Sequence, residues 1–158
     1  MTRIAITGHR GLPNDVEALV DRALRAELSP HTGSLVGISC LADGADQLFA
    51  RALLDLGGEL EVVVPAARYR DGLPAEARES YDALLSRARR VRRLDHYEST
   101  AQSHMDASVE MLKDADLLIA VWDGLPARGL GGTADVVAYA RDHGIPVSVI
   151  WPEGARRD

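Results

Sequence analysis

The stretch GLGGTAD, residues 129–135, contains the residue types of an anion-binding site. Its glycines precede a run that is predicted to be helical, and the first N–H groups of a helix lack partners and carry partial positive charge. Gly131 and Gly132 have no Cβ, so a phosphate could approach their amides closely, and Thr133 could offer its hydroxyl. In the alternative interpretation, Thr133 is only an N-cap and the glycines only shape a turn.

A second polar loop, TGHRG, directly follows the first strand-like run of the sequence. Gly8 permits a tight turn after Thr7, and Arg10 is a permanently charged, forked donor that suits phosphate or carboxylate. His9 is either a hydrogen-bonded structural residue or a proton donor. Because only Gly8 and Gly11 are present, the loop departs from the GxGxxG dinucleotide-binding motif. We expect Thr7, Gly8 and Arg10 to contact a ligand, unless Arg10 pairs with a surface carboxylate.

The segment ADGAD, residues 42–46, follows the second strand-like run. Gly44 and Ala45 are small enough for a ligand to approach the start of the next helix closely. Asp43 is expected to be the N-cap of that helix, and Asp46 lies in its first turn, where the helix dipole favours a carboxylate. Capping alone would explain both aspartates without a functional role.

Two further carboxylates flank the predicted anion site, Asp123 before it and Asp135 at its end. Neither is expected to touch a phosphate, but each could accept hydrogen bonds from ribose hydroxyls or act on a bond to the sugar. The candidate catalytic residues are therefore Asp135, Asp123 and His9. Asp135 alternatively serves only to stabilise the helix through its dipole. No metal site is expected, because Cys40, the single cysteine, has no CxxC partner.

Hydrophobic periodicity predicts strands that alternate with helices. The expected strands, including a weak edge strand at 91–94, are residues 3–7, 34–39, 60–64, 91–94, 117–122 and 146–151. This alternation predicts an α/β fold, a single-domain Rossmann-like three-layer sandwich with a mainly parallel sheet. Because the loops that follow parallel strands meet at one edge, Gly8, Gly44 and Gly132 should converge around one cleft.

The composition is typical of a globular chain organised as one domain over residues 1–158, with a polar tail at 152–158 that we expect to fray. Hydrophobic residues make up 46% and charged residues 27%, which argues against disorder. The net charge of −6 disfavours nucleic-acid binding, because an acidic surface repels phosphate backbones. No run approaches the roughly 20 apolar residues that span a bilayer, and no signal peptide is apparent, so we expect a cytoplasmic protein without membrane contact.

Taken together, these loops resemble the SLOG superfamily of Rossmann-like nucleotide-binding proteins, which includes the LOG phosphoribohydrolases and the DNA-processing protein DprA. The resemblance covers residues 3–151 and rests on TGHRG, GISCLADGAD and AVWDGLPARGLGGTADVVAYARDHGIPV. It implies a modified Rossmann fold that binds a nucleotide or a nucleotide-derived ligand. LOG members cleave the N-glycosidic bond of nucleoside monophosphates, and DprA binds single-stranded DNA. Many LOG members are dimers, so the resemblance also implies a homodimer.

The sequence departs from the LOG pattern PGGxGTxxE at the positions of the glutamates. GLGGTAD keeps the glycines and Thr133, but Asp135 is followed by Val136 and Val137 instead of completing a Glu pair. The leading hypothesis is therefore a module that binds a nucleotide or nucleotide sugar as a sensor, with no certain cofactor beyond that ligand. The alternatives are an N-glycosidic-bond hydrolase or transferase acting on nucleoside monophosphates, and an interaction domain with architectural glycine loops. Aromatic residues make up only 4%, which argues against a platform for single-stranded DNA.

Overall fold

The computed structural model describes residues 1–129 and 131–157. Strands in this part of the chain form one six-stranded sheet in the order β4-β3-β2-β1-β5-β6, and every neighbouring pair is parallel. The strands are β1 (Thr2–Gly8), β2 (Leu35–Ser39), β3 (Glu59–Val64), β4 (Arg90–Arg93), β5 (Leu117–Val121) and β6 (Val147–Ile150). The helices are α1 (Asn14–Leu28), α2 (Ala45–Asp55), α3 (Ala75–Ser86), α4 (Ala101–Leu112) and α5 (Thr133–Asp142), with short 3-10 turns at η1 (Ser29–His31) and η2 (Arg70–Gly72). The predicted parallel sheet is confirmed, and its strand ends differ from the prediction by one residue at most.

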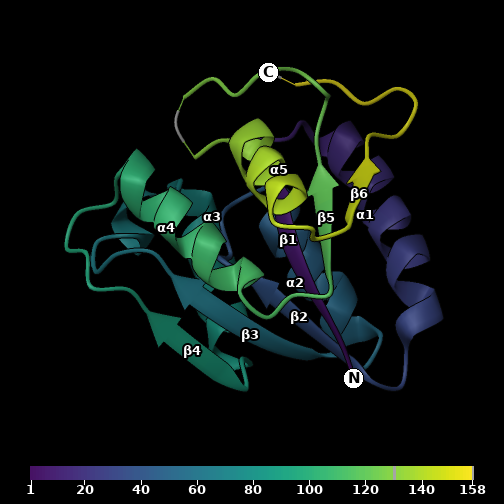
Figure 1. The fold of residues 1–158 in the computed structure, drawn as a ribbon, viewed down its shortest axis with the longest axis horizontal. Coiled ribbons are helices and arrows are strands. Elements are labelled where there is room, and N and C mark those ends of the chain that lie inside the picture. Colours follow the sequence, from purple (N-terminus) through teal and green to yellow (C-terminus); the bar gives the residue numbers. More distant parts are fainter. Residues whose placement is uncertain (130, 158) are drawn as a thin grey trace.

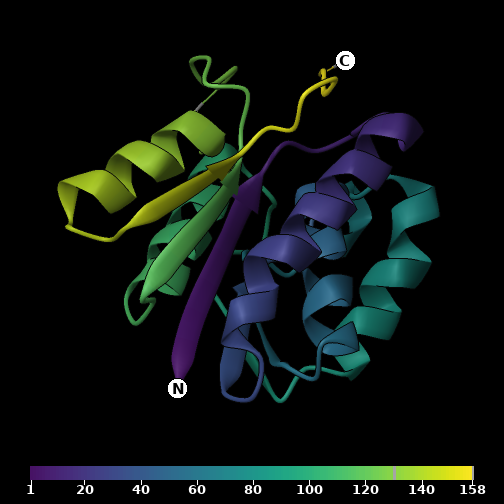
Figure 2. The same cartoon turned by 90° about the vertical axis from the view of Figure 1, so that its right-hand side faces the viewer.

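Helices α1, α2 and α3 cover one face of the sheet, and α4 and α5 cover the other (Figure 1, Figure 2). Because both faces are covered, a central strand can be apolar throughout, and β2 is buried along its whole length. The edge strand β4 is exposed or half-buried and pairs with β3, as the weak pattern at 91–94 indicates. The three-layer α/β sandwich is therefore confirmed. None of the helices in the described part of the chain is long and apolar enough to cross a membrane.

The strand order reverses beside β1. From β1 the chain continues through β2, β3 and β4 on one side, and β5 and β6 are then added on the other side. Gly8 at the end of β1 pairs with Val121 at the end of β5, and Figure 2 shows the two strands side by side. In open α/β sheets, ligands bind at the carboxyl edge where the connections diverge in this way. The fold therefore places a binding crevice at the loops that follow β1 and β5.

Candidate functional site

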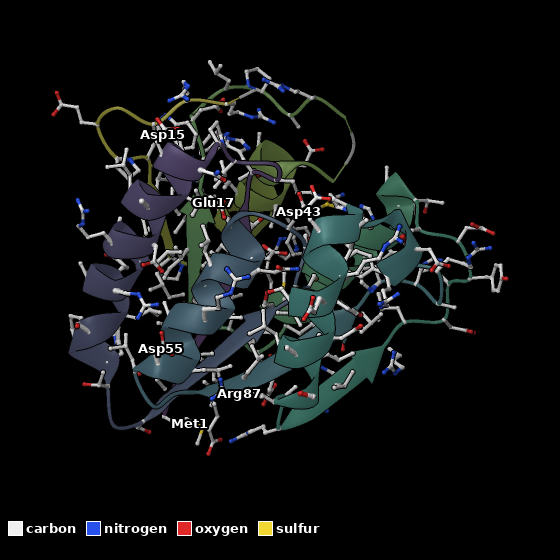
Figure 3. All side chains as sticks on the ribbon, turned by 180° about the vertical axis from the view of Figure 1, so that it is seen from behind. Met1, Asp15, Glu17, Asp43, Asp55 and Arg87 are labelled. Carbon is white, nitrogen blue, oxygen red and sulfur yellow. The ribbon has the colours of Figure 1, made fainter. Side chains whose placement is uncertain are left out.

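A cavity of about 440 Å³ opens at the carboxyl edge of the sheet, beside the ends of β1 and β5. The predicted site residues that line it are Thr7, Gly8, His9, Arg10, Gly131, Gly132 and Thr133. The predicted site residues that lie outside its lining are Gly44, Ala45, Asp123 and Asp135. Figure 3 shows Asp43 at the start of α2, near this edge, and Met1 at the opposite edge. The loops after β1 and β5 thus meet at one cavity, and the loop after β2 contributes Ala42 and Asp46 to it.

The two glycines before α5 have different structural reasons to be glycine. Gly131 has a φ of +82°, which favours glycine, and a Cβ there would lie 2.9 Å from the carbonyl oxygen of Ala101. Gly132 has a φ of −70°, which any residue can adopt, but its Cβ would lie 2.9 Å from the Cβ of Ala127. Gly132 is therefore required by the packing of its own loop, and the unusual backbone conformation belongs to Gly131.

The first amides of the GLGGTAD loop are already hydrogen-bonded. Gly131 donates its N–H to Oδ2 of Asp135 at 3.0 Å, and Gly132 donates its N–H to the carbonyl oxygen of Gly129 at 3.2 Å. The next two amides, those of Thr133 and Ala134, have no acceptor among the described residues, and both residues line the cavity. Gly132 takes the N-cap position, so Thr133 is not an N-cap. Among the described residues, the amides without an acceptor at this helix start are therefore those of Thr133 and Ala134.

His9 is buried and links the loops that follow β1 and β5. Its Nε2 accepts a hydrogen bond from the backbone N–H of Asp123 at 3.0 Å, and its Nδ1 lies 3.5 Å from Oγ1 of Thr133. Nε2 also lies 3.3 Å from Oδ1 of Asp123, but a backbone N–H can only donate, so we place the ring proton on Nδ1. Burial and the positive charge of Arg157 lower the pKa of His9. The ring is therefore neutral near pH 7 and serves to position the loops.

The two candidate catalytic carboxylates hold loop backbone. Asp123 accepts the N–H of Leu125 at 3.0 Å and lies 3.5 Å from the guanidinium of Arg157. Burial acts to raise the pKa of Asp123, but the hydrogen bond from Leu125 and the charge of Arg157 outweigh it, and the pKa is lowered. Asp135 accepts the N–H of Gly131, as described above. Both carboxylates therefore have structural partners, and neither forms part of the cavity wall.

Arg10 lies at the mouth of the cavity, where its side chain is 43% exposed. Its Nε donates to Oδ1 of Asp43 at 2.8 Å, and Oδ2 of Asp43 accepts the N–H of Gly11 at 3.0 Å. The expectation that Asp43 caps α2 is therefore wrong, because Gly44 takes the N-cap position and Asp43 instead fastens the loop after β1. The alternative in which Arg10 pairs with a carboxylate is the one observed.

The small residues at the start of α2 allow the loop after β1 to approach this helix closely. A Cβ on Gly44, which has a φ of +85°, would lie 2.6 Å from the carbonyl oxygen of His9. That oxygen accepts the N–H of Ala45 at 3.2 Å. A Cβ on Gly8 would in turn lie 2.4 Å from the Cβ of Ala45. The close approach expected of a ligand at Gly44 and Ala45 is thus made by the loop after β1.

Two arginines that the sequence patterns did not single out also line the cavity, Arg128 and Arg157. Arg157 pairs with Asp123, and its neighbour Arg156 pairs with Asp15 on α1. Residues 152–157 thus run back toward the site, and whether this tail frays stays a prediction. Arg10, Arg128 and Arg157 thus bring three guanidinium groups to the cavity of a chain whose net charge is −6.

The end of the cavity lined by the loops after β2 and β3 contains functional candidates that sequence reasoning missed. Asp46 is only 8% exposed and lines the cavity, where burial raises its pKa to about 7. Tyr69, which follows β3, is 3% exposed and lines the same end, as do His104 and Met111 of α4. The sequence assigned Asp46 a role in the first turn of a helix, and nothing in its neighbours indicates that this turn faces a cavity. The aromatic and sulfur-containing residues come from distant elements, so only the fold brings them together.

The loop after β2 is strained beside this end of the cavity. Leu41 is fully buried and has a φ of +59°, a conformation that non-glycine residues rarely adopt. Its N–H donates to Oγ of Ser39 at 3.0 Å, and its carbonyl oxygen accepts from Nε2 of Gln47 at 3.1 Å. Strain of this kind persists where surrounding contacts enforce it, and it is common at binding sites. The turn at Leu41 places Cys40 and Ala42, on either side of it, in the cavity wall.

Comparison with known proteins identifies the fold. The sequence matches no protein-family model and no curated protein. DprA from Streptococcus pneumoniae is 16% identical with a TM-score of 0.69, and the match covers 98% of this chain and 52% of that one. The chain has the fold of DprA. A structure of DprA from Helicobacter pylori, described for its single-stranded DNA binding mode, matches at 15% identity and a TM-score of 0.66, covering 98% of this chain and 67% of that one.

The DprA-like fold also occurs in a molybdenum cofactor binding protein from Rippkaea orientalis. That protein is 13% identical with a TM-score of 0.58, and the match covers 94% of this chain and 75% of that one. The fold implied by the resemblance to the SLOG superfamily is therefore confirmed. The chain spans about half of the pneumococcal DprA, and identities this low establish the shared fold alone. The ligand of this DprA-like chain has to be argued from its own cavity.

Proposed function

We propose that the chain binds a nucleotide, or a similar phosphorylated heterocycle, in the cavity beside β1 and β5. The observation that carries the proposal is the pair of amides at Thr133 and Ala134, which begin a helix, lack an acceptor among the described residues and face the cavity. Such an end attracts a phosphate through its N–H groups and its dipole. The cavity volume of about 440 Å³ lies within the range of small-molecule sites.

The arginines that line the cavity support a phosphate at this end. Arg128 and Arg157 lie near His9, since the charges of both act on its ring, and His9 lies against Thr133. A guanidinium offers paired donors that match the geometry of phosphate oxygens. Arg10 lies at the mouth, where its guanidinium is paired with Asp43. The arrangement favours an anionic small molecule over a neutral one.

The geometry supports binding more than hydrolysis by the candidate catalytic residues. Cleavage of an N-glycosidic bond would need a carboxylate that faces the sugar. Asp123 and Asp135 are instead bonded to the amides of Leu125 and Gly131, outside the cavity wall. His9 is neutral and bonded on Nε2.

We propose that the chain acts as a nucleotide sensor. The homodimer and the cytoplasmic location stay predictions, and light scattering would measure whether the chain forms a dimer.

Calorimetry with nucleoside monophosphates and the matching nucleosides tests this proposal. The monophosphate should bind at least about tenfold more tightly than the nucleoside, because charge-assisted hydrogen bonds to the phosphate are lost in the latter. Ala134→Asp puts a carboxylate at the expected phosphate position, in a first turn that tolerates it, and should abolish this preference. The matched control is Ala75→Asp, which makes the same charge change at the exposed first residue of α3. Equal binding of nucleoside and monophosphate, or no binding of any nucleotide, would contradict the proposal.

A further inference from the structure

The carboxyl group of Asp46 has unused hydrogen-bonding capacity inside the cavity. Its Oδ2 accepts the N–H of Ala42 at 3.2 Å, and its Oδ1 has no partner among the described residues. The side chain lines the cavity, so a ligand bound there can donate to this oxygen. The charged neighbours are Arg10, which lies close enough to lower the pKa, and Asp43, which raises it, and these two are paired with each other.

Tyr69 provides a second unpartnered polar group at the same end. Its hydroxyl has no hydrogen-bond partner among residues 1–129 and 131–157, although the side chain is almost fully buried and lines the cavity. Burial raises the pKa of Tyr69 well above its usual value of 10, so the hydroxyl keeps its proton and can donate. Cys40 and His104 are the other titratable groups here. Burial raises the pKa of the Cys40 thiol and lowers the pKa of His104, so both are neutral near pH 7.

The walls around these two groups suit a flat ring. His104 and Tyr69 meet edge to face, with ring centroids 5.6 Å apart, and Met111 and Pro65 complete this part of the lining. Aromatic and thioether groups pack well against a planar heterocycle. A phosphate held at α5 would leave the rest of the ligand to extend toward this end. The group expected here is therefore the heterocycle of the proposed ligand.

We propose that Asp46 and Tyr69 recognise the amino-oxo edge that guanine, a 2-amino-6-oxopurine, shares with the 2-amino-4-oxo ring of a pterin. On this edge a ring N–H and an exocyclic amino group donate side by side, which matches the two oxygens of one carboxylate, and the adjacent oxo group accepts from the tyrosine hydroxyl. Adenine presents an acceptor and a donor in the corresponding places, so it would need a protonated Asp46. The inference rests on the proposed nucleotide function and names the ligand class within it.

The test is calorimetry with GMP, IMP and AMP at about pH 7.5, using the full chain. IMP differs from GMP only in lacking the 2-amino group, so the ratio of their affinities isolates that group from the phosphate and ribose. GMP should bind about 10-fold to 100-fold more tightly than IMP, since one hydrogen bond to a charged group is lost. Asp46→Asn should bring this ratio close to one. Tyr69→Phe should weaken GMP and IMP equally, because both carry the oxo group.

Two further arms sharpen the result. Asp55→Asn makes the same change in charge at the far end of α2, outside the cavity wall, and should leave the ratio of GMP to IMP affinity unaltered. The ratio should fall as the pH drops below about 7, where Asp46 gains a proton, and should not change with pH in the Asp46→Asn variant.

Competition between GMP and unphosphorylated neopterin distinguishes the two ligands that carry this edge. Displacement of GMP identifies a pterin as an accepted ligand, and retention of GMP identifies the purine nucleotide.

The outcomes separate this inference from the proposed function. Tighter binding of AMP than of GMP would overturn it, because Asp46 would then act as a protonated donor. Equal weakening of GMP, IMP and AMP by Asp46→Asn would also overturn it and would assign the carboxyl to ribose or to the fold. If the three nucleotides bind alike, only this inference fails. If none of them binds and neopterin does not bind either, the proposed function fails with it.

Discussion

Helices α2 and α5 begin at the same edge of the sheet, on opposite faces and on either side of β1, yet their first turns have different partners. Each begins after a glycine N-cap and carries an aspartate in its first turn, Asp46 in α2 and Asp135 in α5. In α2, the N–H of Ala45 is taken by the carbonyl oxygen of His9, and Asp46 faces the cavity. In α5, the aspartate turns back to the loop amide before the helix, and the amides that follow face the cavity without an acceptor among the described residues.

The comparison shows that another part of the chain can take the amide that a helix end would otherwise offer to an anion. At α2 the loop after β1 approaches so closely that Gly44 must be glycine, and the carbonyl oxygen of His9 takes the N–H of Ala45. At α5 the aspartate accepts the loop amide of Gly131, and the amides of Thr133 and Ala134 have no acceptor among the described residues. Two similar stretches of sequence thus present different groups to one cavity, the carboxyl group of Asp46 at α2 and the residues Thr133 and Ala134 at α5.

The largest expected effect is a loss of stability when the contact between Gly44 and His9 is disrupted. Gly44→Ala should reduce the free energy of unfolding by about 2–5 kcal/mol, because it adds a Cβ both to a positive φ and against the carbonyl oxygen of His9. Gly57→Ala is the matched control, since Gly57 also has a positive φ but has nothing within 4 Å of an added Cβ. It should cost only about 1 kcal/mol. Urea unfolding measures both losses of stability, and equal losses would show that the carbonyl oxygen of His9 does not exclude a side chain at position 44.

The second-largest expected effect is a pH-dependent change in stability on substitution of Asp46. The pKa of Asp46 is about 7 in the folded chain and near 3.8 when unfolded, so folding takes up a proton between these values and stability falls as the pH rises through them. The penalty is complete above about pH 7. Asp46→Asn removes it and should raise the free energy of unfolding by roughly 2–4 kcal/mol at pH 8, with little change near pH 4. Thermal unfolding at both pH values is the measurement, and a variant less stable than the parent at pH 8 would contradict the prediction.

A smaller effect tests the availability of α5. Thr133→Val keeps the shape of the side chain but removes the hydroxyl that lies in the cavity beside His9. The affinity for a nucleoside monophosphate should fall by about tenfold, which corresponds to the loss of one hydrogen bond to a charged phosphate. Thr2→Val at the opposite end of β1 is the control and should bind as the parent does. In an amide NMR titration with inorganic phosphate, Thr133 and Ala134 should shift and Ala45 should not; the reverse pattern would disprove the comparison.

The smallest effect concerns the other aspartate. Asp135→Asn keeps an oxygen that can accept the N–H of Gly131 but removes the charge near the start of α5. The free energy of unfolding should fall by about 0.3–1 kcal/mol in low salt, and by less in high salt, because the charge interacts with the helix dipole. At pH 8 the sign is opposite to that of Asp46→Asn. Stabilisation by both substitutions would mean that the two first turns are equivalent after all.

Much of the fold could be predicted from the sequence because its signals are local. The β-branched run at 3–7, the apolar run at 117–122 and the helical spacing between them depend on neighbouring residues, and they correctly predict a parallel sheet. The convergence of the loops after β1 and β5 follows from that sheet, since parallel strands end at one edge. The loop residues Arg10 and Thr133 were therefore placed at the cavity from sequence alone.

Only the tertiary structure decided how the site residues are used. Asp123 and His9 lie 114 positions apart in the chain, and their hydrogen bond makes Nε2 of His9 an acceptor. Asp43 reads as a helix cap, but it accepts from Arg10 because the loop after β1 comes within reach. Asp46 and Tyr69 become neighbours only when β2 and β3 pair. Hydrogen-bond partners and burial depend on what packs against a residue across the fold, whereas strand and helix patterns depend on its neighbours along the chain.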